Sequence, residues 1–275
     1  MSEKIPNVLS IAGVDPSGGA GIFADLKTFS ALGAYGCGVV TALTAQNTRA
    51  VEGVMLVDPA FVQQQMRTLF ADVRIDAIKI GMLGAVPLIE GVAEALRRFA
   101  PGVPVVLDPV MVAKSGDPLL AEDAVDALRS TLLPLATLIT PNLPEAGVLL
   151  GGAAPASLDE MRIALPRLRA MMAPGAGHWV MLKGGHLDDR ADDLLGDGDT
   201  VIELPGRRVP TRNTHGTGCS LSAAIAALLP RAENLPDAVR QAKQWLSGAI
   251  EHADDLSVGE GHGPVHHFHE LWGQY

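Results

Sequence analysis

Residues 77–109 read AIKIGMLGAVPLIEGVAEALRRFAPGVPVVLDP, and this stretch decides the fold class. The apolar run at 77–82 predicts a strand, and apolar residues at three- and four-residue spacing within 88–99 predict an amphipathic helix. A second, strongly apolar strand is expected at 103–107, where an Asp-Pro pair ends it. Two strands joined by a helix form a right-handed unit in which the strands run parallel. The stretch therefore predicts an α/β protein.

The same alternation of strands and helices continues along almost the whole chain. Further strands are expected at 7–14, 38–45, 51–57, 138–140 and 179–183, with antiparallel strands in 192–210 around the turn at 196–199. Helices are expected from Ile22 to a stop at Gly33, from the Asp58-Pro59 pair onward, around 161–171 and along 239–249. No linker, repeat or low-complexity segment divides the sequence. Residues 1–275 are therefore interpreted as a single domain, with helices covering both faces of a mainly parallel sheet.

Composition and charge narrow the possible functions. The 275 residues are 48% hydrophobic but only 4% aromatic, which suits small and branched side chains packed between helices and a buried sheet. A net charge of −10 argues against a broad nucleic-acid surface, which needs clustered Lys and Arg. Residues 1–9 carry no signal-peptide pattern, and no run of about 18 apolar residues predicts a membrane span. Cys37 and Cys219 give neither a disulfide framework nor a zinc-ligand pattern, so we expect a soluble cytoplasmic protein.

Residues 214–229, THGTGCSLSAAIAALL, combine a glycine loop, a cysteine and a helix of small residues. Gly216 and Gly218 allow a tight turn and close approach to a ligand, and the helix that starts near Thr217 presents unpaired amides and the positive end of its dipole. An anion such as a phosphate fits such a helix start. The same field is expected to lower the pKa of the Cys219 thiol, which would make it a base or a nucleophile. The alternative is an ordinary glycine turn beside a buried cysteine.

Several loops that carry polar residues or glycines follow predicted strands. Ligands of α/β sheets bind beyond the carboxyl ends of the strands, so these loops are candidates for one shared site: 15–21, 46–48, 81–82, 108–115, 142–145 and 183–186. Asp108 and Glu145 lie just after strand ends and could together hold Mg²⁺ beside a phosphate, directly or through water. Taken singly, each is more often a capping or loop residue, with Glu145 in the first turn of a helix over 143–150.

Residues 19–24, GAGIFA, fit the loose glycine fingerprint of dinucleotide-binding folds. That fingerprint also requires an acidic residue at the end of the second strand, and 38–46 contains none, so nicotinamide binding is excluded. The loop is then either a plain turn and helix start or a wall of a substrate pocket, with Asp25 in the first helical turn. Neither a P-loop nor a protein-kinase catalytic loop occurs in the sequence.

Other polar residues give weaker signals. Gln46, Asn47 and Asp25 could supply hydrogen bonds to a polar heterocycle, with Met82 as an adaptable apolar contact, although a Met at a strand end is more often part of the core. Lys114 is either part of a flap near phosphates or, more commonly, an exposed loop lysine.

Four histidines near the C-terminus, His262, His266, His267 and His269, suggest a metal site at first sight. No placed carboxylate or defined geometry accompanies them, so we do not expect a metal there, and their role stays open. Cys37 is most simply a small buried core residue.

The chain closely resembles the bacterial hydroxymethylpyrimidine and phosphomethylpyrimidine kinases, members of the ribokinase-like superfamily. The resemblance covers nearly the whole chain and rests on AGVDPSGGAG at 12–21, TALTAQNT at 41–48, KIGM at 79–82, DPVM at 108–111, TPNLPEA at 140–146, KGGH at 183–186, HGTGC at 215–219 and GPVHHFH at 263–269. It implies a three-layer α/β/α fold of the ribokinase-like type. It also implies ATP-dependent phosphorylation of 4-amino-5-hydroxymethyl-2-methylpyrimidine to its monophosphate and then to the diphosphate, in thiamine biosynthesis.

The resemblance further implies roles for residues on the substrate side. Gln46 would read the pyrimidine ring, and Asp25, Gly13 and Met82 would line its pocket. A homodimer is implied as well, together with small-molecule rather than nucleic-acid or membrane partners.

On the phosphate side, the resemblance implies an anion hole made by Gly216, Thr217 and Gly218. Cys219 would stand where sugar-kinase relatives carry an aspartate base. Asp108 and Glu145 would organise Mg²⁺, and Lys183 would lie toward the nucleotide, with ATP as co-substrate. The strands within 192–210 would flank the adenine.

Three other functions compete with this interpretation. A pyridoxal or pyridoxine kinase is the nearest, because its substrates are also small heteroaromatic alcohols. A sugar kinase is less favoured, because an Asp would be expected in place of Cys219. A non-catalytic pyrimidine or phosphate sensor on the same fold would not need the base and metal positions at Cys219, Asp108 and Glu145.

Overall fold

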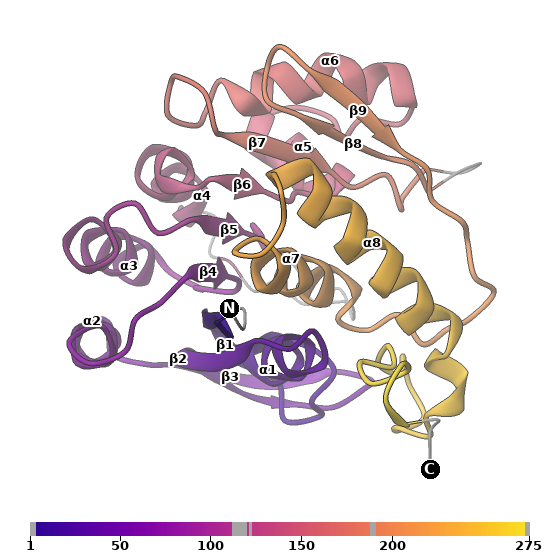
Figure 1. The fold of residues 1–275 in the computed structure, drawn as a ribbon, viewed down its shortest axis with the longest axis horizontal. Coiled ribbons are helices and arrows are strands. Elements are labelled where there is room, and N and C mark those ends of the chain that lie inside the picture. Colours follow the sequence, from indigo (N-terminus) through magenta and orange to yellow (C-terminus); the bar gives the residue numbers. More distant parts are fainter. Residues whose placement is uncertain (1–3, 112–119, 121–122, 188–190, 273–275) are drawn as a thin grey trace.

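The structure is a computed structural model that describes residues 4–111, 120, 123–187 and 191–272. Within these residues, nine strands form one sheet, and helices pack on both of its faces (Figure 1). The strands are β1 (Asn7–Val14), β2 (Tyr35–Gln46), β3 (Val51–Leu56), β4 (Ala77–Ile80), β5 (Val105–Leu107), β6 (Leu138–Ile139), β7 (Trp179–Leu182), β8 (Asp193–Gly196) and β9 (Val201–Leu204). The helices are α1 (Gly21–Ala31), α2 (Pro59–Phe70), α3 (Val86–Phe99), α4 (Ala124–Ala127), α5 (Leu143–Leu150), α6 (Leu158–Arg169), α7 (Thr217–Leu228) and α8 (Leu235–Glu251).

The sheet has the strand order β3-β2-β1-β4-β5-β6-β7-β8-β9. Strands β2, β1, β4, β5, β6 and β7 pair in parallel, whereas β3 at one edge and β8 and β9 at the other pair antiparallel. The prediction of a mainly parallel sheet with antiparallel strands near 192–210 is therefore confirmed. From β1 the chain passes outward to β2 and β3 and then returns to β4 on the other side of β1, which creates a switch point where α/β sheets bind ligands.

Alternating residues of the strands face two separate apolar cores. Leu9 and Ile11 of β1 belong to the core that packs against α2, α3, α5 and α6, whereas Val8 belongs to the core that packs against α1, α7 and α8. A strand that is buried on both faces reads as an apolar run, which is how the sequence predicted these strands. The arrangement confirms the predicted three layers of helices, sheet and helices (Figure 1).

Local capping explains where two helices begin. The Asp58 carboxylate accepts hydrogen bonds from the amides of Ala60 and Phe61 at the start of α2, as the Asp-Pro pair predicts. Asn142 and Glu145 form a reciprocal capping box at the start of α5. Glu145 therefore lies in the first turn of α5, as expected.

Some predicted boundaries were wrong by a few residues. Strand β2 starts at Tyr35 instead of residue 38 because its first residues already pair with β1. Helix α1 starts at Gly21, so Asp25 lies in its second turn and not in the first. Within the described part of the chain, none of the helices combines the length and apolarity that a membrane span requires.

Candidate active site

Helix α7 lies against the central strands β1, β4 and β5. Gly216, which precedes it, has a φ of 74°, a left-handed conformation that glycine adopts without strain. A Cβ on Gly218 would lie 3.3 Å from Lys183 Nζ and 3.6 Å from Asp108 Oδ2. The Thr217 hydroxyl donates to the Thr214 carbonyl at 2.7 Å and helps to hold the loop. The free amides of this helix start are therefore close to an ammonium and a carboxylate.

The loop before α7 packs directly on the glycine loop before α1. A Cβ on Gly216 would come within 1.7 Å of the Gly19 carbonyl oxygen, and one on Gly19 would come within 2.4 Å of the His215 ring. No side chain fits between the two backbones at these points. The two glycine motifs form one structural unit, although they lie near opposite ends of the sequence.

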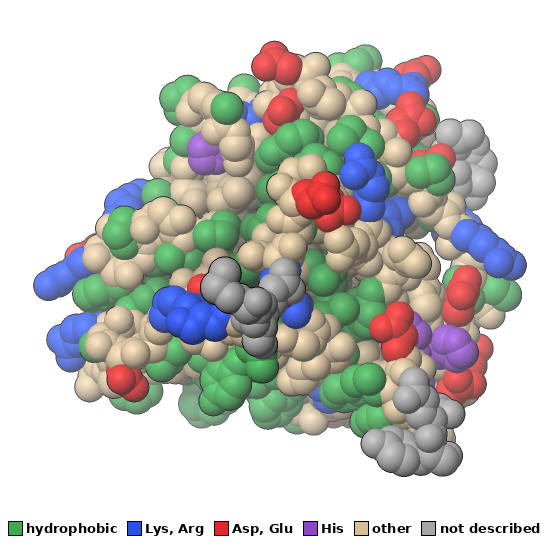
Figure 2. Space-filling view, in the orientation of Figure 1, with side chains coloured by type: hydrophobic (Ala, Val, Ile, Leu, Met, Phe, Trp, Pro, Cys, Tyr) green, Lys and Arg blue, Asp and Glu red, His purple; other side chains and the backbone are tan. Residues whose placement is uncertain are grey.

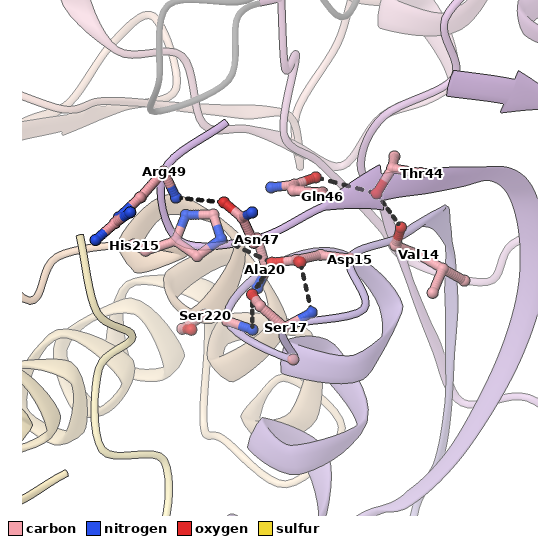
Figure 3. A network of polar contacts seen from close by, with 12 residues as sticks. Val14, Asp15, Ser17, Ala20, Thr44, Gln46, Asn47, Arg49, His215 and Ser220 are labelled. Carbon is pink, nitrogen blue, oxygen red and sulfur yellow. Dashed lines mark hydrogen bonds and ion pairs between the residues drawn. The ribbon is translucent and has the colours of Figure 1, made fainter. Parts of the chain in front are cut away.

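The Asp15 side chain joins these two loops (Figure 3). Its Oδ2 lies 2.7 Å from His215 Nε2 and also accepts hydrogen bonds from the Ser17 hydroxyl at 2.8 Å and the Ala20 amide at 3.0 Å. Burial raises the pKa of the Asp15 carboxyl, but the contacts with His215 and Ser17 outweigh burial and hold this pKa below its ordinary value. Asp15 therefore stays ionised and fastens the loops together.

Asp108, Lys183 and Glu145 form a charged group beyond the carboxyl ends of β5, β6 and β7. Lys183 Nζ donates to Asp108 Oδ1 at 2.9 Å, and the Thr140 hydroxyl donates to the same oxygen at 3.1 Å. Burial raises the pKa of Glu145 to about 7, with Lys183 lowering it and Asp108 raising it further. Burial lowers the pKa of Lys183, but Asp108 and Glu145 outweigh burial and keep the ammonium charged.

The donor set of this group fits Mg²⁺ beside phosphates. Among the described residues, no three or more His, Cys, Asp or Glu side chains cluster in a way that could hold a metal. Mg²⁺ bound next to phosphates usually needs only one or two carboxylates, because phosphate oxygens and water complete its shell. Asp108 and Glu145 match this requirement, and a cation beside them would offset the burial of the Glu145 carboxylate and its repulsion by Asp108, which together raise the Glu145 pKa.

Cys219 lies in the first turn of α7 and is half-buried. The prediction that the helix start lowers the pKa of its thiol was wrong. Burial raises this pKa above its ordinary value, Lys79 lowers it, and Asp25 and Asp108 raise it further. Desolvation of the thiolate therefore outweighs the field of the helix in the protein without ligands. A hydrogen bond from the Gly21 amide favours the thiolate more weakly.

The predicted substrate residues lie at the same edge of the sheet. A Cβ on Gly13 would be 3.2 Å from Met82 Sδ, so these two residues are neighbours. Gln46 ends β2, and its Oε1 accepts a hydrogen bond from the Thr44 hydroxyl at 3.2 Å, which leaves its amide nitrogen directed away from Thr44 (Figure 3). Asn47 caps the following turn through two backbone amides. These residues follow β1, β2 and β4, whose carboxyl ends point toward the glycine loops.

Asp25, predicted to line the substrate pocket, lies beneath it instead. The side chain is fully buried, and its two carboxylate oxygens lie 2.9 Å and 2.8 Å from Lys79 Nζ. The Ser10 hydroxyl donates to Oδ2 at 2.6 Å. The structure therefore corrects the pocket prediction at this residue, because the ion pair turns its carboxylate toward the protein interior.

A C-terminal segment that starts at Gly259 packs against two loops of the candidate site. A Cβ on Gly259 or Gly261 would come within 2.3 Å or 2.1 Å of Thr48, in the turn after Gln46. A Cβ on Gly263 would come within 2.3 Å of Asn213 Oδ1, just before the α7 loop. The segment thus packs against both the substrate side and the anion side of the site.

Three of the four C-terminal histidines, His266, His267 and His269, pack against the rest of the protein, whereas His262 is exposed. His267 Nε2 lies 3.0 Å from the Ser220 hydroxyl of α7, and burial lowers the pKa of His267 to about 3. The His269 ring stacks on His252 and lies 6.0 Å from the Trp245 ring centre. These contacts anchor the C-terminal segment on α7 and α8.

Two contacts of the site were not predicted from the sequence. The Asp15–His215 contact joins two motifs that the sequence did single out, so each residue was visible but their pairing was not. The second contact is the ion pair between Lys79 and Asp25. The sequence assigned no role to Lys79, although a lysine inside an apolar strand is itself a signal. Lys114 and the rest of 112–115 lie outside the described residues.

Comparisons with known proteins agree with this geometry. Residues 15–266 match the family described as phosphomethylpyrimidine kinase. A hydroxymethylpyrimidine/phosphomethylpyrimidine kinase from Escherichia coli (strain K12) is 57% identical over 97% of this chain and 98% of its own length. A solved phosphomethylpyrimidine kinase from Clostridium difficile has 37% identity and a TM-score of 0.77 over 90% of this chain and 100% of its own. A pyridoxal kinase from Staphylococcus aureus, solved with AMP-PCP and pyridoxal, has 33% identity and a TM-score of 0.85 over 98% of this chain and 96% of its own. By its sequence, its fold and the motifs that meet at the start of α7, this chain belongs to the phosphomethylpyrimidine kinase family.

Proposed function

We propose that this chain transfers the γ-phosphate of ATP to 4-amino-5-hydroxymethyl-2-methylpyrimidine and then to the resulting monophosphate, within thiamine biosynthesis. The observation that carries the proposal is the start of α7, where the amides of the first helical turn lie beside Cys219 and the group of Asp108, Lys183 and Glu145. Family membership supports the same activity. We further place the protein in the cytoplasm, since both of its cysteines are free thiols, as is usual in reducing compartments.

We assign each group a part in the first transfer. The thiolate form of Cys219 accepts the hydroxymethyl proton and becomes a thiol while the alcohol oxygen attacks the γ-phosphorus, and the bond from that phosphorus to the bridging oxygen breaks to release ADP. The amides of the α7 turn stabilise the charge on the transferred group without having to reorganise. Lys183 supplies a fixed positive charge next to them. In the second transfer the acceptor is already a phosphate, so it needs little help from a base.

Asp108 and Glu145 would hold Mg²⁺ during both transfers. When bound, the ion would shield the phosphate charge that repels the incoming oxygen. We expect Glu145→Gln to raise the Mg²⁺ concentration needed for half-maximal ADP release by about tenfold, because the neutral amide is a weaker ligand but keeps the helix cap. Glu94→Gln, on the exposed side of α3, is the control. An unchanged Mg²⁺ requirement in Glu145→Gln would exclude Glu145 as a ligand.

ADP release with four separate acceptors tests the proposed function. The acceptors are the hydroxymethylpyrimidine, its monophosphate, pyridoxal and ribose, each with Mg²⁺ and ATP. Turnover on both pyrimidines, with weak turnover on pyridoxal and none on ribose, is expected. Faster turnover on pyridoxal than on both pyrimidines would instead assign the protein to vitamin B6 salvage. The similarity to the Staphylococcus aureus pyridoxal kinase is the reason to test this alternative. Binding without ADP release would support a sensor.

We also propose that the protein forms a homodimer through the face of β2 and β3. Leu43 and Met55 are directly paired across these strands, share one face of the sheet and are 48% and 68% exposed. Val54 and Leu56 are exposed on the opposite face of the edge strand β3. Hydrophobic side chains are visible along the lower edge of the molecule in Figure 2, where Figure 1 places these strands. An apolar patch of this kind on an edge of a sheet favours pairing with a second copy.

Sedimentation equilibrium measures the molecular mass in solution and so tests the proposed dimer. The wild-type protein is expected to be a dimer, and Met55→Lys is expected to be a monomer because it would bury a charge in the interface. Val201→Lys places the same charge on the exposed β9 at the opposite edge and should leave the dimer intact. A monomeric wild-type protein would contradict the proposal.

A further inference from the structure

Lys79 and Asp25 form a fully buried ion pair between β4 and α1. Both side chains are 0% exposed, and Ser10, the register partner of Lys79 on β1, completes the arrangement with its hydrogen bond to Asp25. Replacing a buried ion pair by apolar residues of similar volume is often neutral or stabilising, so stability alone does not account for this pair. The pair has no part in the chemistry described so far.

The strand alternation places Lys79 beneath α7. Ile78 and Ile80 face the core on the α2 and α3 side, whereas Ala77 faces the core that contains α7 and α8. Lys79 shares the face of Ala77, because side chains two residues apart in a strand point the same way. Helix α7 contacts β4 on this face. The ammonium therefore lies under the helix whose first turn carries Cys219.

The absence of a side chain at Gly81 leaves room for the Lys79 ammonium. A Cβ on Gly81 would lie 2.8 Å from Lys79 Nζ and 3.2 Å from Ala12 Cβ. Any other residue at 81 would therefore press on the charged group. This contact explains the glycine of the KIGM motif at 79–82, which also contributes Met82 to the predicted pocket.

Lys79 remains charged despite its burial. Burial lowers the pKa of its ammonium, but Asp25, Cys219 and Asp108 together outweigh burial, so the pKa lies above its ordinary value. Cys219 and Lys79 therefore lie close enough to interact electrostatically. A buried charge of this kind acts strongly on its neighbours because little water screens it.

We propose that Lys79 is a positioning residue for phosphoryl transfer, which places a fixed positive charge under Cys219 and so favours the thiolate that accepts the substrate proton. Asp25 holds this charge in place through the ion pair, whereas Ser10 adds an uncharged hydrogen bond to Asp25. The charged groups that face the thiol are Lys79 and Asp25 from below, and Asp108 and Lys183 from the carboxyl ends of β5 and β7. The inference rests on the role proposed for Cys219 in the first transfer.

The pH dependence of Cys219 alkylation by iodoacetamide tests this inference without a kinase assay. Peptide mass spectrometry separates Cys219 from Cys37. The double variant Lys79→Met/Asp25→Asn removes both charges and leaves neither unpaired. Its alkylation midpoint should rise by about one pH unit, so that alkylation below the midpoint is about tenfold slower. Ser10→Ala keeps both charges and is the matched control, with a midpoint close to that of the wild type.

Two results would overturn the inference. One is a folded double variant whose midpoint does not move, and the other is a Ser10→Ala midpoint that moves as far as that of the double variant. If the double variant does not fold, Asp25→Asn alone replaces it. Loss of the negative charge should then lower the midpoint, and an unmoved or raised midpoint would overturn the inference.

Kinase measurements on the same proteins separate this inference from the proposed function. An inactive wild-type protein whose Cys219 midpoint responds to Lys79 would contradict the proposed function only. An active wild-type protein with a midpoint insensitive to Lys79 would contradict this inference only. When both hold, the double variant should lose kcat in the first transfer, about tenfold in line with its thiolate fraction, with little change in the KM for ATP.

Discussion

Cys219→Ala is expected to lower the rate of the first phosphorylation by about 100-fold and that of the second by less than about tenfold. The alcohol of the first acceptor must lose a proton as it attacks, and Cys219 is the group placed to take that proton. The monophosphate that accepts the second phosphate is already ionised, so its attack depends on charge neutralisation and alignment. Both of those contributions remain when the thiol is removed.

Single-turnover rates with each acceptor, measured by rapid quench, test this difference. Single-turnover conditions are needed because slow product release would mask an effect on chemistry. Cys37→Ala is the matched control, since this second cysteine is buried in β2 and lies away from the α7 turn. Equal losses in both transfers would show that Cys219 shapes the site without acting as a base.

Gly216→Ala is expected to lower both transfers by about 1,000-fold, because it disrupts the anion hole itself. The new methyl group would meet the Gly19 carbonyl oxygen, and residue 216 would have to hold a left-handed backbone conformation that favours glycine. The two glycine loops would have to separate, which would move the amides that face the transferred phosphate. The loss should appear in kcat with both acceptors, unlike the selective loss in Cys219→Ala.

Gly102→Ala separates the effect of backbone strain from the effect of the steric clash with Gly19. Gly102 also has a left-handed φ, 77°, but a Cβ there would have no atom within 4 Å. It should therefore lose about 1–2 kcal/mol of stability from backbone strain and keep its kcat. Thermal unfolding and ADP release measured on both variants give the comparison. A Gly216→Ala enzyme as active as Gly102→Ala would exclude the anion hole proposed at α7.

Much of the fold could be predicted from the sequence because its strands are buried on both faces. Such strands appear as short apolar runs, and the helices between them show the periodicity of an amphipathic helix. The alternation of the two patterns predicted the parallel sheet. The shared site could be predicted for a related reason. Parallel strands end at the same edge of the sheet, and the structure brings Gly218, Lys183 and Asp108 together at that edge.

The sequence did not reveal which charged residues pair with each other. It also did not reveal whether the pKa of Cys219 is raised or lowered. Asp25 was assigned to the pocket because nothing in its local sequence shows that Lys79 lies opposite it. The pKa of Cys219 was predicted from the helix dipole alone. Its direction depends on how much water the fold removes from the thiol, and burial of that kind is set by distant segments.

The C-terminal segment from Gly259 also sets the order in which this protein can mature. The central strands are synthesised early, but Asp15 meets His215 only 200 residues later, and Thr48 meets Gly261 after a further stretch of translation. Contacts of such long sequence separation form late, since closing large loops is entropically unfavourable. A nascent chain on the ribosome can thus bury much of its sheet before it has any catalytic power. We therefore expect the contacts that join the loops of the candidate site to form after most of the sheet is in place.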